Sequence, residues 1–258
     1  MRKDVKIGLA IAGVLFAVLI VYVAVISAPP VKKALVHSFV PEKIDVLAII
    51  TLVGGTVGGY ITFAGGHRLL DAGIKGKAAL GQIAQSAVAG IGVASVIRVF
   101  LFLAALGVVS QGLPVDAGNP PASVFKQAAG AVGYVLFGLV MLAAAITSVI
   151  GSAYTSVSFI KSFSGKIERH ENGVIIGFIV VSTLIFVTIG RPVQLLLLAG
   201  ALNGLILPIT LSTILVAAYR EDVVKEYKHP WWLTVAGIVA ILILAWMGAH
   251  TLITQLAL

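Results

Sequence analysis

A glycine-rich stretch in the first third of the sequence has the composition of a backbone binding site. Six glycines fall within the 13 residues that begin at Gly54, and His67 follows directly. Each glycine lowers helix stability by about 1 kcal/mol relative to alanine, so we expect an interrupted helix, and close helix packing is the alternative. Peptide groups freed inside a membrane need protein, water or a ligand as partners. Half-helix ends and unwound carbonyls of this kind can bind a solute.

Arg98 is a charged residue within an apolar segment. Twenty uncharged residues precede it and 17 follow it. An arginine at this depth is costly in lipid, and snorkelling to a surface is the alternative. We expect a buried partner or an aqueous path around it. No acidic residue lies within a segment, so carbonyls, water or another chain would have to serve.

Two further groups of polar residues lie within apolar segments. Ser148 and Ser152 share a helical face with Thr155 and Ser156, and this face lines a polar path or hydrogen-bonds to neighbouring helices. Asn203 falls near the middle of its segment, before Pro208, which removes a helical hydrogen bond. We consider Asn203 a candidate substrate contact, with a structural bond between helices as the alternative.

The composition requires that these residues be held by membrane-spanning helices. The mean hydropathy is +1.09, with 59% hydrophobic and 11% charged residues, whereas a soluble domain carries about 25% charged residues. Long uncharged runs favour helices over a barrel. We therefore predict an all-α, polytopic membrane helix bundle, formed as a single transmembrane domain over residues 1–258.

Seven uncharged runs are each long enough to cross the roughly 30 Å hydrocarbon core, which takes about 20 helical residues. The predicted transmembrane helices lie near residues 7–28, 45–66 (broken), 81–110, 127–160, 172–190, 192–219 and 230–255. We expect the first to be a retained helix, because its apolar run exceeds that of a signal peptide.

The distribution of basic residues predicts the orientation. Of the 18 lysines and arginines, twelve lie on the side of the N-terminus and five on the other. Positive residues accumulate on the cytoplasmic side, so we expect a multi-pass protein of the cell membrane with its N-terminus in the cytoplasm and its C-terminus outside. The net charge of +8 then reflects topology and contact with the lipid bilayer, and no nucleic-acid partner is expected.

Two stretches resemble a known family. Residues 55–67, Gly-Thr-Val-Gly-Gly-Tyr-Ile-Thr-Phe-Ala-Gly-Gly-His, and residues 145–159, Ala-Ile-Thr-Ser-Val-Ile-Gly-Ser-Ala-Tyr-Thr-Ser-Val-Ser-Phe, are similar to the sixth and eighth helices of NRAMP-type divalent metal transporters. The order of the seven segments matches that family's helices five to eleven. The resemblance implies part of a LeuT-type inverted-repeat fold with one discontinuous helix, and secondary transport of a divalent cation with protons as the coupling ion and no cofactor.

The resemblance also implies roles for individual residues. The carbonyl of Thr62 would be a metal ligand, His67 would serve proton coupling or gating, and Asn203 lies one turn from a position that approaches the ion. The remaining ion-path positions are Gly58, Gly59, Gly65 and Gly66. The family's Met-Pro-His triplet is here Gly-Gly-His, which removes a soft thioether ligand. This departure leaves room for a harder cation or a small organic acid as the solute.

The family's Asp-Pro-Gly motif does not occur in this sequence, so half of the expected cavity wall is missing. We expect a separately encoded chain to supply the first four helices, or else a truncated remnant. A third hypothesis is a membrane subunit that does not itself transport. Motifs of hydrolases, metalloproteases and P-loop enzymes are absent from the sequence, and we expect no enzyme.

Overall fold

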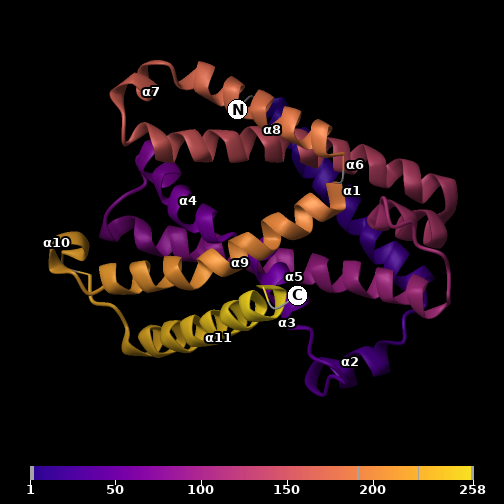
Figure 1. Cartoon of the computed structure of the whole chain (residues 1–258). Helices are drawn as coiled ribbons and strands as arrows, with labels where there is room; N and C mark the ends of the chain where they lie inside the picture. Colours follow the sequence, from indigo (N-terminus) through magenta and orange to yellow (C-terminus); the bar gives the residue numbers. More distant parts are fainter. Residues whose placement is uncertain (1–2, 191, 226, 257–258) are drawn as a thin grey trace. The chain divides into compact units, whose positions relative to one another are not determined.

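The chain folds into helices in the computed structural model, which describes residues 3–190, 192–225 and 227–256 (Figure 1). No strand occurs in that part of the chain. In chain order the elements are α1 (Lys3–Ile26), α2 (Val31–Phe39), α3 (Val46–Val57), α4 (Gly59–Asp71), the 3-10 turn η1 (Lys77–Ala79), α5 (Leu80–Ser110), α6 (Pro120–Lys161), α7 (Gly165–Arg169), α8 (Glu171–Ile189), α9 (Pro192–Ala217), α10 (Glu221–Val224) and α11 (Trp231–Leu256). The predicted all-helical class is confirmed.

The contacts divide the chain into two compact units. The first comprises Met1–Glu42 and Leu80–Gly151, and the second comprises Lys43–Ala79 and Ser152–Leu258. The boundary after Gly151 falls inside α6. The sequence analysis predicted a single transmembrane domain, and the division into two units does not test that prediction.

The first unit packs α1 against α5 and the beginning of α6. Its core contains the fully buried Val23 of α1 and Val108 of α5, with Phe125 of α6 stacked on Phe137 at 4.5 Å between ring centroids. Gln111 donates a hydrogen bond of 2.6 Å to the carbonyl of Ser27, at the end of α1. This polar contact ties the C-terminal end of α5 to α1.

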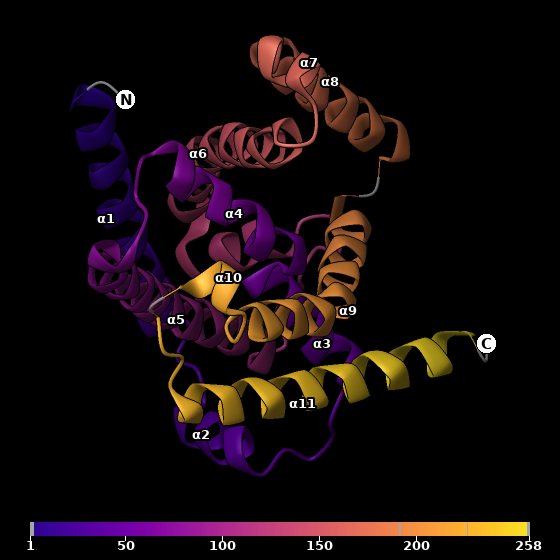
Figure 2. The same ribbon diagram turned by 90° about the vertical axis from the view of Figure 1, so that its left-hand side faces the viewer.

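The second unit packs α3 against α9 and α11, which also lie against each other (Figure 2). Asp45 caps α3 by accepting a hydrogen bond from the amide of Ala48 at 2.9 Å, which satisfies one free donor at the helix start. Ile50 of α3 is fully buried and Leu207 of α9 is 2% exposed. These apolar contacts hold the first half of the glycine-rich segment in place.

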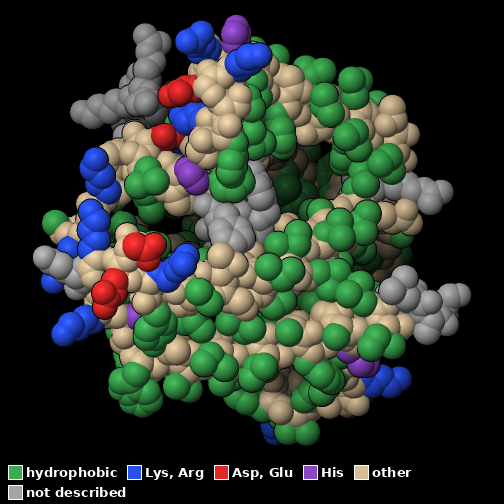
Figure 3. Space-filling model, turned by 60° about the vertical axis from the view of Figure 1, so that its left-hand side comes forward, with side chains coloured by type: hydrophobic (Ala, Val, Ile, Leu, Met, Phe, Trp, Pro, Cys, Tyr) green, Lys and Arg blue, Asp and Glu red, His purple; other side chains and the backbone are tan. Residues whose placement is uncertain are grey.

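The exposed surface is largely apolar, as expected of helices that face lipid. Hydrophobic side chains are spread widely over the face shown in Figure 3, while charged side chains gather mainly at its left. Val88, Leu196 and Trp231 are each at least 70% exposed. Five described helices are long and apolar enough to cross a membrane, namely α5, α6, α8, α9 and α11. A sixth crossing is counted if Gly13–Ile26 of α1 and α2, which are bent by 101° to each other, form one span. The predicted number of seven is reached only if α3 and α4 together form one crossing.

Helix α6 contains an interruption that the sequence analysis did not predict. Its backbone at Gly130 has φ 64° and ψ −155°, which is not helical. The long fourth segment is therefore a short helix before Gly130 followed by a longer one.

Candidate functional site

The glycine-rich segment is interrupted at Gly58. Helix α3 ends at Val57, Gly58 has φ 66° and ψ 91°, and α4 begins at Gly59. Positive φ at this value strains any residue that carries a Cβ, and a Cβ at Gly58 would also lie 2.9 Å from Cγ2 of Ile61. The predicted discontinuous helix is confirmed, and its break falls near the middle of the apolar run.

The break sets two helix ends against each other. The amide of Gly58 donates to the carbonyl of Gly54 at 2.9 Å, which completes one bond of the last turn of α3. The last carbonyls of a helix and its first amides have no partner within the helix, and they carry partial negative and positive charge respectively. Carbonyls of α3 and amides of α4 are thus brought to the same place in the segment.

Thr62 lies in the first turn of α4. In an α-helix its carbonyl accepts a hydrogen bond from the amide four residues further on, so it would become a free ligand only if this turn opened. The backbone at Gly59 and Thr62 is described as helical, but the Thr62 side chain and the burial of both residues lie outside the described part. The ligand role of Thr62 stays a prediction.

Close backbone packing joins α3 to α9. A Cβ at Gly54 would collide with the backbone of Gly200 and Gly204, and a Cβ at Gly200 would lie 2.8 Å from the carbonyl oxygen of Thr51. Small residues four apart let two helices approach in this way. Close helix packing therefore explains the glycine at position 54, whereas the glycine at position 58 allows the positive φ at which the helix is interrupted.

Asn203 of α9 is half-buried and directly precedes Gly204, where an added Cβ would collide with the backbone of Ile50 in α3. Its position places an amide side chain on the helix that packs on α3. The proposed substrate contact at Asn203 remains a prediction.

The end of the predicted ion path lies in α4. A Cβ added at Gly65 or Gly66 would meet nothing within 4 Å, so neither glycine is required by packing in this structure. His67 is half-buried, and its ring meets Phe159 of α6 edge-on, with 5.2 Å between centroids. The imidazole is thereby held against α6 by an aromatic contact.

A polar cluster follows His67 at the end of α4. Arg68 donates to the hydroxyl of Thr155 at 3.4 Å and lies 5.4 Å from the ring centroid of Tyr154. Asp71 accepts a 2.6 Å hydrogen bond from Ser158 and pairs with Lys161 at 3.2 Å. Four side chains of α6 thus meet two charged side chains of α4.

The Asp71 carboxylate is held in its charged form. The Ser158 hydroxyl, with the largest effect, and the Lys161 ammonium lower the pKa of Asp71, although partial burial opposes them. Lys161 also pairs with Glu171 at the start of α8, at 3.4 Å. The two ion pairs connect the ends of α4 and α6 to the start of α8.

The sequence analysis did not identify this cluster. Asp71 is the last residue of α4 and forms an ion pair with Lys161. Thr155, Ser158 and Lys161 recur every three residues along α6, and this spacing is the sequence signal that points toward a shared partner.

The proposed polar path contains residues in different environments. Ser148 and Ser152 are exposed, whereas Thr155 and Ser156 are buried. Ser156 donates to the carbonyl of Ser152 at 2.9 Å, within its own helix. Arg98 is exposed on α5. The path stays a prediction.

No group of three His, Cys, Asp or Glu side chains that could hold a metal ion occurs in the described part of the chain. The segment around the break contains carbonyl and hydroxyl oxygens. These are ligands for hard cations rather than for soft ones.

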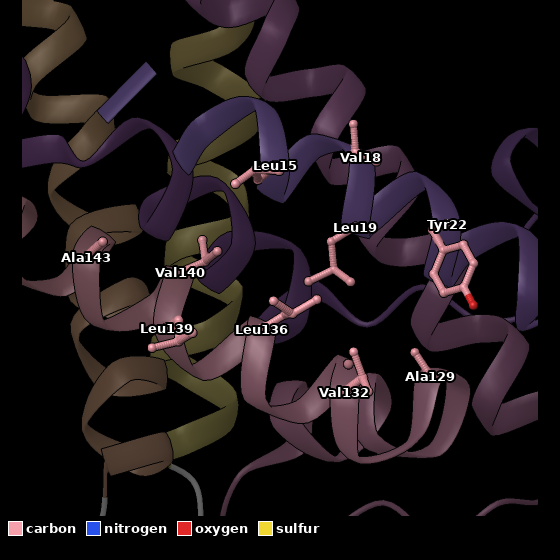
Figure 4. Close-up of a pocket in the computed structure, with 11 residues that line it drawn as sticks. Leu15, Val18, Leu19, Tyr22, Ala129, Val132, Leu136, Leu139, Val140 and Ala143 are labelled. Carbon is pink, nitrogen blue, oxygen red and sulfur yellow. The ribbon is translucent and has the colours of Figure 1, made fainter. Parts of the chain in front are cut away.

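An apolar cavity of about 680 Å³ lies in the first unit and is lined by none of the predicted site residues. Leu15 and Leu19 of α1 face Val140 and Leu136 of α6 across it, and Tyr22 lies at the end near Ala129 (Figure 4). Its lining offers one hydroxyl and no charge. It is suited to an acyl chain or an apolar helix face rather than to an ion.

These features define a polytopic helical membrane protein with a segment interrupted in the middle of an apolar run. A family model described as natural resistance-associated macrophage protein-like, or Nramp, matches residues 3–254. The chain belongs to this NRAMP-like family, a family of metal-ion transporters, and the resemblance seen in the sequence is confirmed.

Curated relatives are similar over almost the whole chain. The uncharacterized membrane protein YcsG of Bacillus subtilis (strain 168) is 64% identical over 246 residues, covering 95% of this chain and 61% of the relative. An uncharacterized membrane protein of Haemophilus influenzae (strain ATCC 51907 / DSM 11121 / KW20 / Rd) is 53% identical over 245 residues, covering 95% and 62%. The chain thus spans less than two thirds of these relatives. No solved structure matches.

Proposed function

We propose that this chain is part of an NRAMP-like secondary transporter that moves a divalent metal cation across the cytoplasmic membrane, with protons as the coupling ion. The observation that carries the proposal is the break at Gly58, in the middle of an apolar segment. Peptide groups at such a break need a partner that lipid does not provide. A solute bound midway through the membrane is such a partner.

The oxygen-rich end of α3 favours a cation. Its last carbonyls carry the negative end of the helix dipole, and carbonyl oxygens are preferred by hard divalent ions. Gly65 stands where the family has a thioether, so selection for soft transition metals is weakened. We therefore favour magnesium- or manganese-like ions over softer ones.

A proton role for His67 fits its place in the segment. The residue lies on α4, the helix that begins at the break, and its ring contacts Phe159. Imidazole is the side chain whose charge changes most readily near neutral pH. Replacement of His67 by alanine should change the pH dependence of uptake, and an unchanged profile would remove histidine from the coupling step.

The rest of the cavity wall comes, in this proposal, from the family's first four helices, supplied by a separately encoded chain. The absence of an Asp-Pro-Gly motif from this sequence supports the view that helices outside these residues complete the cavity wall. The orientation proposed is N-terminus in the cytoplasm and C-terminus outside, from the distribution of basic residues.

A second candidate function rests on the other end of the same break. The first amides of α4 carry partial positive charge, so a small organic acid could bind there through its carboxylate. In this alternative the chain keeps its architecture and carries an anion instead of a cation.

Uptake by reconstituted vesicles separates the candidates. The chain is reconstituted together with the membrane protein encoded next to it, and uptake of radioactive manganese is measured with competition by magnesium and by small organic acids. Inhibition by divalent cations and dependence on a proton gradient support the first proposal, and inhibition by organic acids alone supports the second. Undiminished transport by the lone chain would refute the need for a partner.

If the vesicles neither bind nor transport either class of solute, even with the neighbouring protein present, the remaining explanations are that the chain is a non-transporting subunit or a truncated remnant. Replacing Gly58 provides the site control, because loss of uptake in a folded variant ties transport to the break.

A further inference from the structure

Arg98 lies deep in a long apolar helix. It is the nineteenth residue of the 31-residue α5, so about 27 Å of helix precede it and about 18 Å follow it at 1.5 Å per residue. With α5 centred in the bilayer, the Cα of Arg98 lies about 5 Å from the midplane. Snorkelling does not bring a charge from this depth to the headgroups without distorting the bilayer.

The arginine lies on an exposed part of α5. Ile91, Phe102 and Arg98 itself share one face at helical spacing, and all three are exposed. Within the described part of the chain, the Arg98 side chain takes part in no hydrogen bond, ion pair or ring contact. A guanidinium with five donors therefore stands unsatisfied on an otherwise apolar surface.

The chain itself does not contain a matching charge at this depth. All ten acidic residues lie in connections or at segment ends, namely Asp4, Glu42, Asp45, Asp71, Asp116, Glu168, Glu171, Glu221, Asp222 and Glu226. A second copy has the same distribution and cannot supply a carboxylate either. Charge complementarity thus points to a different polypeptide segment.

The same face is suited to a helix. Ala87 and Ala94 lie on the side of Arg98, seven residues apart, and both are exposed. Small residues allow close approach of a neighbouring backbone, as in other membrane helix pairs. A charged pair between such helices is shielded from lipid on both sides.

We propose that the face of α5 formed by Ala87, Ile91, Ala94, Arg98 and Phe102 binds a transmembrane helix of another polypeptide segment that carries an Asp or Glu at mid-depth. The pair of Arg98 with this carboxylate fixes the depth at which the two helices join. The inference requires only that α5 spans the membrane, and it does not depend on which solute is transported.

Carbodiimide coupling tests this pairing. Arg98→Lys keeps the charge and adds a nucleophile, and membranes of the native host that carry the variant are treated with dicyclohexylcarbodiimide. The reagent activates a carboxyl group, the new amine displaces the urea, and an amide bond records the neighbour. We expect mass spectrometry to find the amine at position 98 joined to an Asp or Glu inside a transmembrane segment that is not part of this chain.

Two variants serve as controls. Arg98→Gln lacks the amine, and Val96→Lys places it on the opposite side of α5, where the original side chain is 57% exposed; neither should give this product. The proposal is overturned if Arg98→Lys gives no coupled protein, if it couples only to carboxylates of this chain, or if Val96→Lys gives the same product.

A charge exchange provides a second measurement. Arg98→Glu should lower the amount of co-purified partner about tenfold or more, and lysine in place of the cross-linked carboxylate should restore it. Retention of the partner by Arg98→Glu would contradict the pairing. The interface and the transport proposal can be tested separately. If the amine at position 98 couples to a neighbouring carboxylate, the interface is supported whether or not uptake by the complex changes.

Discussion

Two glycines interrupt apolar segments in this molecule, and their surroundings differ. Gly58 and Gly130 have nearly the same φ, 66° and 64°. Gly58 lies between two helix halves, one of which is packed on α9 through glycine contacts. Gly130 follows Lys126 and Gln127 closely, and a Cβ there would meet nothing within 4 Å.

The two breaks differ in the polarity of the residues around them. Gln127 donates to the carbonyl of Pro114 in the connection before α6 at 3.1 Å, so the break at Gly130 lies beside the polar end of its segment, where water can satisfy its peptide groups. The break at Gly58 has apolar residues on both sides along the chain. Lipid offers no hydrogen-bond partner to peptide groups at this second break.

The largest effect is expected where the break is anchored. Gly54→Leu would drive a side chain into the backbone of α9, and overpacking against groups that cannot rotate away should lower the free energy of unfolding by about 3 kcal/mol. Thermal unfolding of the purified protein in detergent measures this loss. Gly55→Leu is the control, because a Cβ at Gly55 meets nothing within 4 Å; equal losses would argue against the close packing of α3 on α9.

A direct test of the comparison exchanges both break glycines for alanine. Positive φ should lower the free energy of unfolding by about 1–3 kcal/mol in Gly58→Ala and in Gly130→Ala. Uptake per folded molecule should fall at least about tenfold for Gly58→Ala and less than about twofold for Gly130→Ala. A tenfold fall corresponds to a rise of about 1.4 kcal/mol in the barrier to transport. Similar uptake by the two variants would remove the distinction between the breaks.

The polar cluster beyond the break is expected to have a moderate effect. Asp71→Asn removes the ion pair with Lys161, and partial exposure limits the loss to about 1 kcal/mol. Because the pKa of Asp71 lies below its ordinary value of 3.8, the ionised group stabilises the fold above that pH, and the contribution is lost as the pH falls through the lowered value.

Unfolding measured against pH checks this prediction. The difference between the original protein and Asp71→Asn should be present near neutral pH and shrink in acid. Glu168→Gln, which changes an exposed acidic residue of α7, is the control. A difference that grows as the pH falls would contradict the assigned direction of the pKa shift.

The smallest change in stability is expected at Gly65. A Cβ there meets nothing within 4 Å, and alanine in a helix is favoured over glycine by up to about 1 kcal/mol, so Gly65→Ala should not destabilise the fold. Uptake should nevertheless fall severalfold if the solute approaches this backbone. Gly177→Ala in α8 is the control, because a Cβ there also meets nothing within 4 Å. Equal uptake by Gly65→Ala and Gly177→Ala would count against the close approach.

The sequence was sufficient for features that depend on local composition. Apolar runs predicted the helical membrane class, and glycine density predicted the break in the segment that became α3 and α4. It was not sufficient to locate the break at Gly58, because six glycines share the same conformational freedom and packing on α9 assigns Gly54 another role.

Features that depend on distant contacts were missed or left open. Asp71 and Lys161 are far apart in the sequence, and only the folded chain brings them to 3.2 Å. The sequence did not predict the break at Gly130, because a single glycine within a long apolar run is usually tolerated in a helix. The neighbour of Arg98 does not follow from the chain's own residues.

The direct contact of α3 with α9 limits how this part of the molecule can move. Peptide groups rather than flexible side chains meet at Gly54, Gly200 and Gly204, so the two helices have no soft layer over which to slide. Any movement within this unit would carry α3 and α9 together as one rigid body. Helix α4, which begins after Gly58, also packs against α9, so its angle to α3 can change only if that second contact changes too.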